Sequence, residues 1–203
     1  GIAEAGGTPL EFPSIAVCDG LATGHVGMKM PMLSRELIAD SVELMVTAHG
    51  FDAIVLLSNC DKVTPGMLMA AGRLNIPAIL VTGGPMDTGC YQGRKICYTD
   101  LIEAEGLVER GKLTPEDLVE MEKVANIGPG ACALMGTANC MNILTEAMGM
   151  TLTDGALTPA AYGARIALAR QSGHLIMELH ERRILPRDIL TAEAFENAIA
   201  VDM

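Results

Sequence analysis

Three short apolar runs divide the first part of the chain. They are SIAV at residues 14–17, AIVLL at 53–57 and AILV at 78–81, and turn-forming or polar residues bound each of them. Apolar runs of this length without polar alternation are typical of strands that are buried on both faces of a sheet. The pattern therefore predicts three buried β-strands.

The segments between these runs have the spacing of amphipathic helices. Residues 34–50, SRELIADSVELMVTAHG, have Ser34 as the predicted N-cap and Gly50 just beyond the predicted end. Residues 64–75, TPGMLMAAGRLN, have Thr64 as the predicted cap. Alternating strands and helices predict an α/β fold in which a parallel sheet is covered by helices on both faces, giving three layers.

The chain after the third run is predicted to be mainly helical. Thr114 is the predicted N-cap of a helix whose first turn contains a proline and acidic residues. A glycine turn at residues 128–130 then leads into an apolar helix that we expect to end at Gly149.

The remaining residues predict a helical carboxyl-terminal segment. This tail starts at about residue 159 and is expected to break near Gly173 and Pro186, with Thr191 as the N-cap of the last helix. Neither an internal repeat nor a long linker interrupts the pattern. We therefore expect one domain over residues 1–203.

Composition narrows the classes of function. Half of the 203 residues are hydrophobic, which is enough to bury a core. The 25 acidic and 14 basic residues give a net charge of -11, which argues against binding to nucleic acid or to an anionic membrane surface. The apolar runs are far shorter than the roughly 20 residues that span a bilayer. We therefore expect neither nucleic acid nor a membrane as a partner.

Six cysteines occur at irregular spacings: Cys18, Cys60, Cys90, Cys97, Cys132 and Cys140. A chain of this size does not need disulfides for its stability, and the sequence has no signal peptide ahead of the cysteines. A reducing cytoplasm is the expected compartment. No C-x-x-C pair is present, which disfavours a zinc ribbon or a thioredoxin motif.

Polar and glycine residues follow each of the three predicted strands. CDG at residues 18–20 follows the first strand, SNCDK at 58–62 the second and TGG at 82–84 the third. In an open parallel sheet, ligands bind outside the carboxyl ends of the strands. Any one of these loops is explained as an ordinary turn. The three together favour a binding site.

The residue types in these loops indicate metal chemistry. Thiolates such as that of Cys60 favour iron–sulfur clusters, zinc or copper, whereas carboxylates such as that of Asp61 favour magnesium, calcium or manganese. Their adjacency is consistent with two different metals side by side, although Cys60 alone is better explained as a small buried apolar residue. Cys132 follows the glycine turn at a predicted helix N-terminus, where the dipole favours an anionic sulfur.

Several long stretches resemble one enzyme family. SNCDKVTPGMLMAAGRLNIPAILVTGGPM at residues 58–86 is similar to the dihydroxy-acid dehydratases of branched-chain amino acid biosynthesis, whose wider family includes 6-phosphogluconate and sugar-acid dehydratases. The similarity continues in EFPSIAVCDGLATGHVGM, GPGACALMGTANCMNILTEAMGM and ILTAEAFENAIAVDM, and so covers nearly the whole chain. SRELIADSVELM looks more like the dihydroxy-acid enzymes than the phosphogluconate ones.

The resemblance implies roles for five residues. The cysteines that match Cys60 and Cys132 bind an iron–sulfur cluster, either 2Fe-2S or 4Fe-4S. The aspartates that match Asp19 and Asp61 bind magnesium. The lysine that matches Lys62 is carbamylated and becomes a further magnesium ligand with a catalytic role. A protonated lysine has no lone pair to offer a metal, whereas its carbamate is an anionic oxygen ligand.

The implied reaction is the removal of water from a small-molecule 2,3-dihydroxy acid to give a 2-keto acid, catalysed by a hydro-lyase that is expected to be a homodimer. Family members are longer than 203 residues. Their third cluster cysteine lies upstream of the position of Gly1, and a carboxyl-terminal domain supplies a magnesium-binding glutamate and a serine base. We therefore expect this chain to be an amino-terminal fragment that is inactive alone.

Two other interpretations remain open from the sequence. One is a sugar-acid or 6-phosphogluconate dehydratase that uses the same metals. The other, from a different class, is a non-catalytic dimerisation module. The resemblance gives no role to four of the cysteines: Cys18, Cys90, Cys97 and Cys140.

Overall fold

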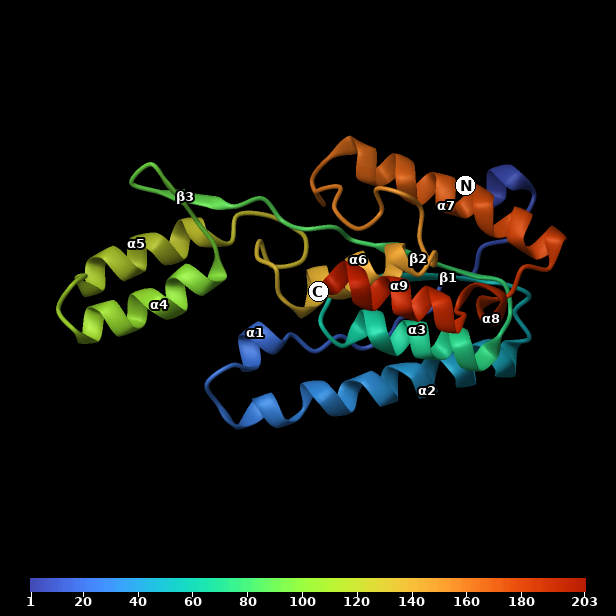
Figure 1. Cartoon of the computed structure of the whole chain (residues 1–203), viewed down its shortest axis with the longest axis horizontal. Helices are drawn as coiled ribbons and strands as arrows, with labels where there is room; N and C mark the ends of the chain where they lie inside the picture. The colour runs from blue at the N-terminus through green and yellow to red at the C-terminus, as the bar shows by residue number, and fades with distance from the viewer.

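A computed structural model describes residues 1–203 as a mixed α/β structure in which helices predominate (Figure 1). The elements, in chain order, are η1 Ala3–Ala5, α1 Asp19–Ala22, η2 Val26–Lys29, α2 Pro31–His49, β1 Ile54–Ser58, α3 Val63–Leu74, β2 Ala78–Thr82, β3 Gly89–Tyr91, β4 Arg94–Ile96, α4 Tyr98–Glu109, α5 Pro115–Ala125, α6 Thr137–Ala147, α7 Gly163–Arg182, α8 Pro186–Ile189 and α9 Ala192–Asp202. None of the helices has both the length and the apolar composition needed to cross a membrane.

The strands β1 and β2 form the central parallel sheet. Their register pairs Ile54 with Ala78 and Ser58 with Thr82, and α3 connects the two strands. Every residue of β2 is buried, as the unbroken apolar run of residues 78–81 predicts. The predicted strand–helix–strand unit from residue 53 to residue 81 is thus confirmed.

The predicted strand at residues 14–17 is not formed. This segment has no regular secondary structure, and Ile15 is 47% exposed. A run of four apolar residues does not specify a backbone partner, and Pro13 lacks an N–H that could join a ladder. The predicted α/β fold is therefore confirmed in part: the parallel sheet has two strands and not three, in a mostly helical structure without the predicted three-layer sandwich.

The main core lies between α2, α3 and the parallel sheet. Ile38 and Val42 of α2 and Leu80 of β2 are at most 1% exposed, as is Met150 from the segment after α6. Helices α2 and α3 approach each other closely at Gly66, where a Cβ atom would lie only 2.8 Å from a backbone oxygen of α2. The core is thus aliphatic, with methionine filling gaps between the elements.

Several predicted helix ends are confirmed. Gly50 ends α2 in the left-handed conformation, with φ 63°. Thr114 caps α5, and its hydroxyl accepts a hydrogen bond from the N–H of Asp117, whose carboxylate accepts in return from the backbone of Thr114. Thr191 caps α9. These caps satisfy backbone groups that a helix end leaves unpaired.

Two other predicted caps are wrong, because their helices begin earlier in the chain. Helix α2 begins at Pro31 and α3 at Val63, so Ser34 and Thr64 lie inside them. The Ser34 hydroxyl donates to the carbonyl of Pro31 at 2.6 Å, and both hydroxyl side chains are buried. Both residues therefore lie inside their helices with buried hydroxyl groups and cap neither helix.

The carboxyl-terminal part is helical as predicted, with one difference. Helix α7 continues through Gly173, where a helix break was predicted. A Cβ atom there would lie 2.8 Å from the backbone nitrogen of Ile2, so the glycine allows the amino-terminal segment to pack against the helix. The break near Pro186 is confirmed, since α7 ends at Arg182 and α8 begins at the proline.

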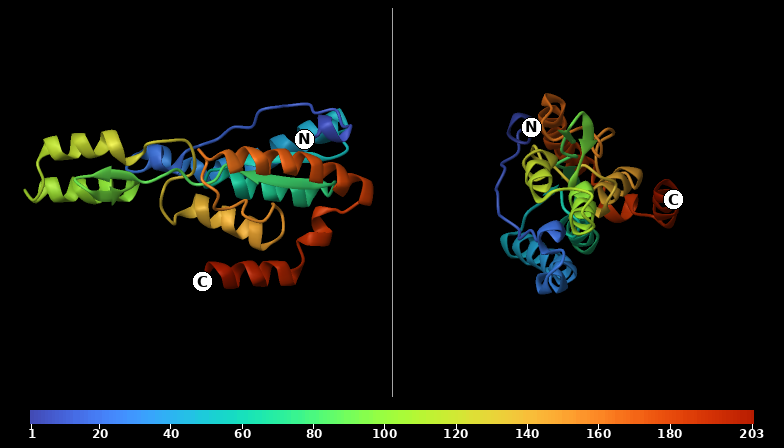
Figure 2. Two further views of the ribbon diagram at one scale, coloured as in Figure 1. Left: turned by 90° about the horizontal axis from the view of Figure 1, so that it is seen from above. Right: turned by 90° about the vertical axis from the view of Figure 1, so that its left-hand side faces the viewer.

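Residues 89–125 form an arm that extends from one end of the body, as Figures 1 and 2 show. The arm consists of the antiparallel pair β3 and β4 and the helices α4 and α5. It has its own small core of four buried residues: Ile96, Ala104, Met121 and Ala125. The two segments that join it to the body run side by side, with bridges between Pro85 and Ala131 and between Thr88 and Asn126.

Candidate functional site

The loop of residues 59–62 leads from β1 directly into α3. The carbonyl of Cys60 accepts hydrogen bonds from the backbone N–H groups of Val63 and Thr64 at 3.1 and 3.2 Å. The buried hydroxyl of Thr64 also donates to the side chain of Ser58 at 3.1 Å. These contacts hold the side chains of the loop at the carboxyl end of β1.

The first two predicted loops meet in an ion pair. The Nζ atom of Lys62 donates to Oδ2 of Asp19 at 2.5 Å, although the residues are 43 positions apart in the chain. The lysine side chain is 15% exposed and the aspartate side chain 11%. The other carboxylate oxygen of Asp19, Oδ1, is buried and has no hydrogen-bond partner. This oxygen is therefore available to a ligand.

Asp61 lies beside this ion pair and adds a second carboxylate. Burial raises the pKa of Asp61 above its ordinary value of 3.8, and the negative charge of Asp19 raises it further, against the opposing effect of Lys62. The single positive charge of Lys62 therefore balances only one of the two carboxylates. Carboxylate oxygens in this situation fit a hard divalent cation such as magnesium.

Lys62 is the third side chain at the site formed by the two carboxylates. No group of three or more His, Cys, Asp or Glu side chains is arranged to hold a metal ion in the chain. Lysine is outside those residue types, because its ammonium group has no lone pair. The site therefore combines two carboxylates with a lysine, which is not a metal ligand in its protonated form.

The two cysteines predicted to bind a cluster are half-buried thiols. The Sγ atom of Cys60 lies 3.8 Å from the carbonyl oxygen of Val17. Burial raises the pKa of the Cys60 thiol to about 11, and burial likewise raises the pKa of the Cys132 thiol. Both thiols are therefore neutral at pH 7, and binding to iron requires the loss of their protons.

The predicted placement of Cys132 at a helix N-terminus is wrong. Helix α6 begins at Thr137, and Cys132 lies in the irregular loop before it. The effect of the helix dipole is confined to the first turn, so it does not reach this sulfur. This explains why the pKa of Cys132 is raised by burial and not lowered as the prediction implied.

The carbonyl oxygen of Gly84 joins the two cysteine loops. It accepts one hydrogen bond from Nδ2 of Asn59 at 3.0 Å and another from the backbone N–H of Ala131 at 2.9 Å. Asn59 directly precedes Cys60 in the chain. Ala131 directly precedes Cys132. Since Gly84 belongs to the third predicted loop, all three loops meet at one place, as predicted.

Cys18, to which no role was assigned from the sequence, lies close to the same loops. The residues on either side of it contact Cys60 and Lys62. The negative charge of its ionised form also raises the pKa of both Cys60 and Cys132. Cys18 was predicted to lie in the first of the three loops that meet here, and only its role was left open. Asn59, between Ser58 and Cys60, was also missed.

The other three cysteines lie in elements outside these loops. Cys90 is exposed in β3, and the side chain of Cys97 lies 3.2 Å from the Thr99 hydroxyl at the start of α4. Cys140 lies within α6, as predicted. All six cysteines of the chain are free thiols.

Comparison with known proteins shows the family of the chain. The model of the dihydroxy-acid/6-phosphogluconate dehydratase amino-terminal domain matches residues 1–203. The chain therefore belongs to this family, which confirms the resemblance found in the sequence.

Individual relatives are dihydroxy-acid dehydratases. The chain is 55% identical to the one from Moorella thermoacetica, 56% identical to the one from Halothermothrix orenii and 53% identical to the one from Clostridium kluyveri, each over all 203 residues. The chain spans 36 to 37% of the length of these curated relatives. It thus corresponds to little more than a third of a complete relative.

Proposed function

We propose that this chain is the cluster- and magnesium-binding part of a longer dihydroxy-acid dehydratase. The parent enzyme removes water from a 2,3-dihydroxy acid to give a 2-keto acid in the biosynthesis of valine and isoleucine. The observation that carries the proposal is the unpartnered, buried Oδ1 atom of Asp19, which lies in a site shared with Asp61 and Lys62. The names of the relatives support the choice of reaction.

Asp19, Asp61 and modified Lys62 hold magnesium in this proposal. The Lys62 ammonium first loses a proton, and the neutral amine then forms a C–N bond with carbon dioxide and releases a second proton, which gives an anionic carbamate. The cation of the present ion pair is thereby replaced by an oxygen ligand, and magnesium supplies the charge that balances the three anionic groups. The low exposure of Lys62 and Asp19 limits the competition from water.

Cys60 and Cys132 hold the iron–sulfur cluster, of the 2Fe-2S or the 4Fe-4S type. Soft thiolates are the ligands that such clusters prefer. When bound, the cluster supplies Lewis acidity toward the departing hydroxyl group, and magnesium fixes the other oxygens of the substrate. Further cluster ligands and the base that removes the C2 proton come from parts of the parent protein outside residues 1–203.

The parent enzyme is further proposed to be a cytoplasmic homodimer. Six free thiols support a reducing compartment, because an oxidising one favours disulfides.

The experiment that tests the function is anaerobic reconstitution of the longer protein with iron and sulfide. Metal analysis is followed by a dehydration assay on 2,3-dihydroxy-3-methylbutanoate. We expect a loaded cluster and turnover of this substrate. Cys60→Ser should lose iron and activity, whereas Cys90→Ser is the matched control, because Cys90 is exposed on the arm.

The assay also separates the proposed function from its alternatives. Turnover of sugar acids or 6-phosphogluconate in place of the dihydroxy acid would keep the metal site but change the substrate. A reconstituted protein that holds no iron and leaves all three classes of acid unchanged would contradict the enzyme and would favour the dimerisation module.

A further inference from the structure

Helix α6 carries two asparagines on the side that faces the cysteine loops. Asn139 is 6% exposed and Asn142 is fully buried. Residues three positions apart in a helix lie on the same face, so the two amides are neighbours. Neither residue has a role in the function proposed above.

Asn139 holds the loop that contains Cys132. Its Nδ2 atom donates to the carbonyl of Cys132 at 2.9 Å and to the carbonyl of Leu134 at 2.7 Å. This loop forms no helix or strand, and the backbone bonds of Ala131 to Gly84 and Met86 hold it only on the side before Cys132. The two hydrogen bonds therefore tie the backbone of Cys132 to a fixed point on α6.

Asn142 holds the loop that contains Cys60. Its Nδ2 atom donates to Oδ1 of Asn59 at 3.1 Å, and the Nδ2 atom of Asn59 in turn donates to the carbonyl of Gly84. The Asn59 amide is thus held from both sides, directly before Cys60. One helix face consequently contacts both cysteine loops.

Asn139 and Asn142 are each unfavourable for the stability of the fold, so stability alone does not explain their presence. The Oδ1 atoms of Asn139 and Asn142 are buried without a hydrogen-bond partner, which is unfavourable. Asparagine is also a weak helix former, and both residues lie inside α6. Local rules broken in this way are expected at functional sites.

We propose that Asn139 and Asn142 are positioning residues, which set the separation and orientation of Cys60 and Cys132 and thereby the geometry of the cluster. The proposal rests on the proposed function, because it requires that these two thiols bind a cluster. Residues behind the ligands of a metal site commonly orient those ligands, and their loss typically lowers metal affinity about 10- to 100-fold.

The test uses the reconstituted longer protein with Asn139→Ala, Asn142→Ala and, as a matched control, Asn197→Ala on the exposed surface of α9. Iron release to a chelator is followed together with the EPR spectrum of the reduced cluster. We expect each α6 variant to release iron about 10- to 100-fold faster and to have a shifted spectrum. The Asn197 variant should match the wild type in both measurements.

A second substitution guards against variants that fail to fold. Asn139→Ser and Asn142→Ser keep a small polar side chain that is too short to make the same hydrogen bonds. Folded variants at both positions with wild-type iron release and a wild-type spectrum would overturn the positioning role alone. A wild-type protein that holds no cluster would overturn the proposed function and this inference with it.

Discussion

The body and the arm of the molecule differ in how they are stabilised. The body buries a continuous core of 16 residues around the β1–α3–β2 unit, whereas the arm has a separate core of four. Every side chain assigned to the candidate site belongs to the body or to the loop that leads back into it. The body has the larger core, and it is therefore the region that holds the site rigidly.

The junction between the two regions is where they influence each other. The segments on either side of the arm are paired at Pro85 and Ala131, next to Cys132. The hydroxyl of Tyr98, at the start of α4, also donates to the carbonyl of Gly20 at 3.0 Å, just after Asp19. The arm is therefore attached at the site but contributes little to the core behind it.

The largest expected effect comes from a core truncation in each region. Leu80→Ala removes a fully buried side chain from β2 and should destabilise the chain by about 2 to 5 kcal/mol. Met121→Ala should open the arm while the body stays folded, because its core is separate. Hydrogen exchange resolved by segment measures both effects. Equal loss of protection in body and arm for both variants would contradict two separately stabilised regions.

A smaller effect is expected from the cap of α5. Thr114→Ala removes the hydroxyl that accepts from the N–H of Asp117 and should destabilise the arm by about 1 kcal/mol. The change should appear as faster hydrogen exchange in residues 115–125. Thr191→Ala, which removes the matching cap of α9 in the body, is the control that should leave the arm unchanged.

The pH dependence of the metal-free chain should change when Asp61 is replaced. Because the pKa of Asp61 is raised by folding, the folded state holds its proton more tightly than the unfolded state. This contribution is present at low pH and is lost as the pH rises from 3.8 through the raised value. Asp61→Asn should therefore make stability fall less steeply with pH in that window. Denaturant unfolding at several pH values measures the difference, and identical slopes would contradict it.

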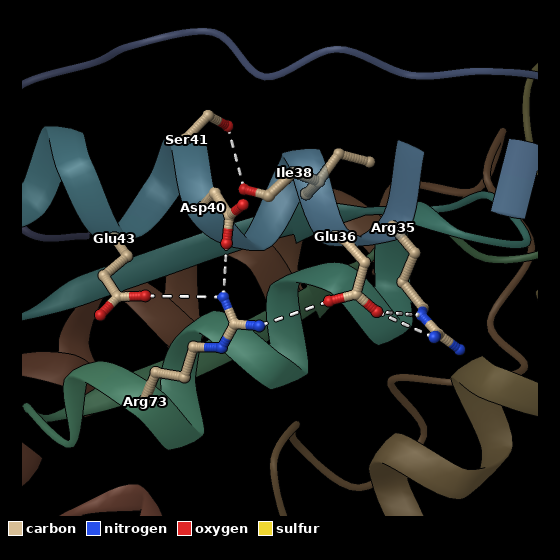
Figure 3. Close-up of polar contacts among 7 residues, drawn as sticks. All are labelled: Arg35, Glu36, Ile38, Asp40, Ser41, Glu43 and Arg73. Carbon is tan, nitrogen blue, oxygen red and sulfur yellow. Dashed lines mark hydrogen bonds and ion pairs between the residues drawn. The ribbon is translucent and has the colours of Figure 1, made fainter. Parts of the chain in front are cut away.

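The smallest effect is expected at the surface of the body. Arg73 of α3 contacts Asp40, Glu43 and Glu36 of α2 (Figure 3), and all four side chains are exposed. Water and salt screen such pairs, so Arg73→Ala should lower the unfolding midpoint only slightly and less at high salt than at low salt. If the decrease in the unfolding midpoint does not depend on salt, the aliphatic part of the Arg73 side chain stabilises the structure by packing instead.

The sequence predicted the fold where side-chain pattern alone decides the structure. The runs at 53–57 and 78–81 become β1 and β2, and Thr114 caps its helix, because burial and capping are local properties. The run at 14–17 failed because a strand also needs a backbone partner. Ser34 and Thr64 failed as caps because their helices begin earlier, at Pro31 and Val63, and their hydroxyls donate to Pro31 and Ser58 instead.

The meeting of the three loops was predicted, but the side chains that hold these loops in place were not. The three loops meet as expected, but only two of them follow strands of the sheet, since residues 18–20 follow a segment that forms no strand. The roles of Asn139 and Asn142 could not be predicted, since Asn142 bonds to Asn59, 83 positions away, and Asn139 bonds to backbone carbonyls of an irregular loop. The irregular path of residues 128–136 also depends on those contacts, so the start of α6 was misplaced.

The most direct test of the central claim is the magnesium content of the reconstituted longer protein with Asp61→Ala. The matched control is Asp52→Ala, which alters an exposed carboxylate before β1. We expect the Asp61 variant to lose bound magnesium but to keep cluster iron and sulfide, while the control keeps all three. Magnesium retained at the wild-type level by a folded Asp61→Ala protein would contradict this expectation.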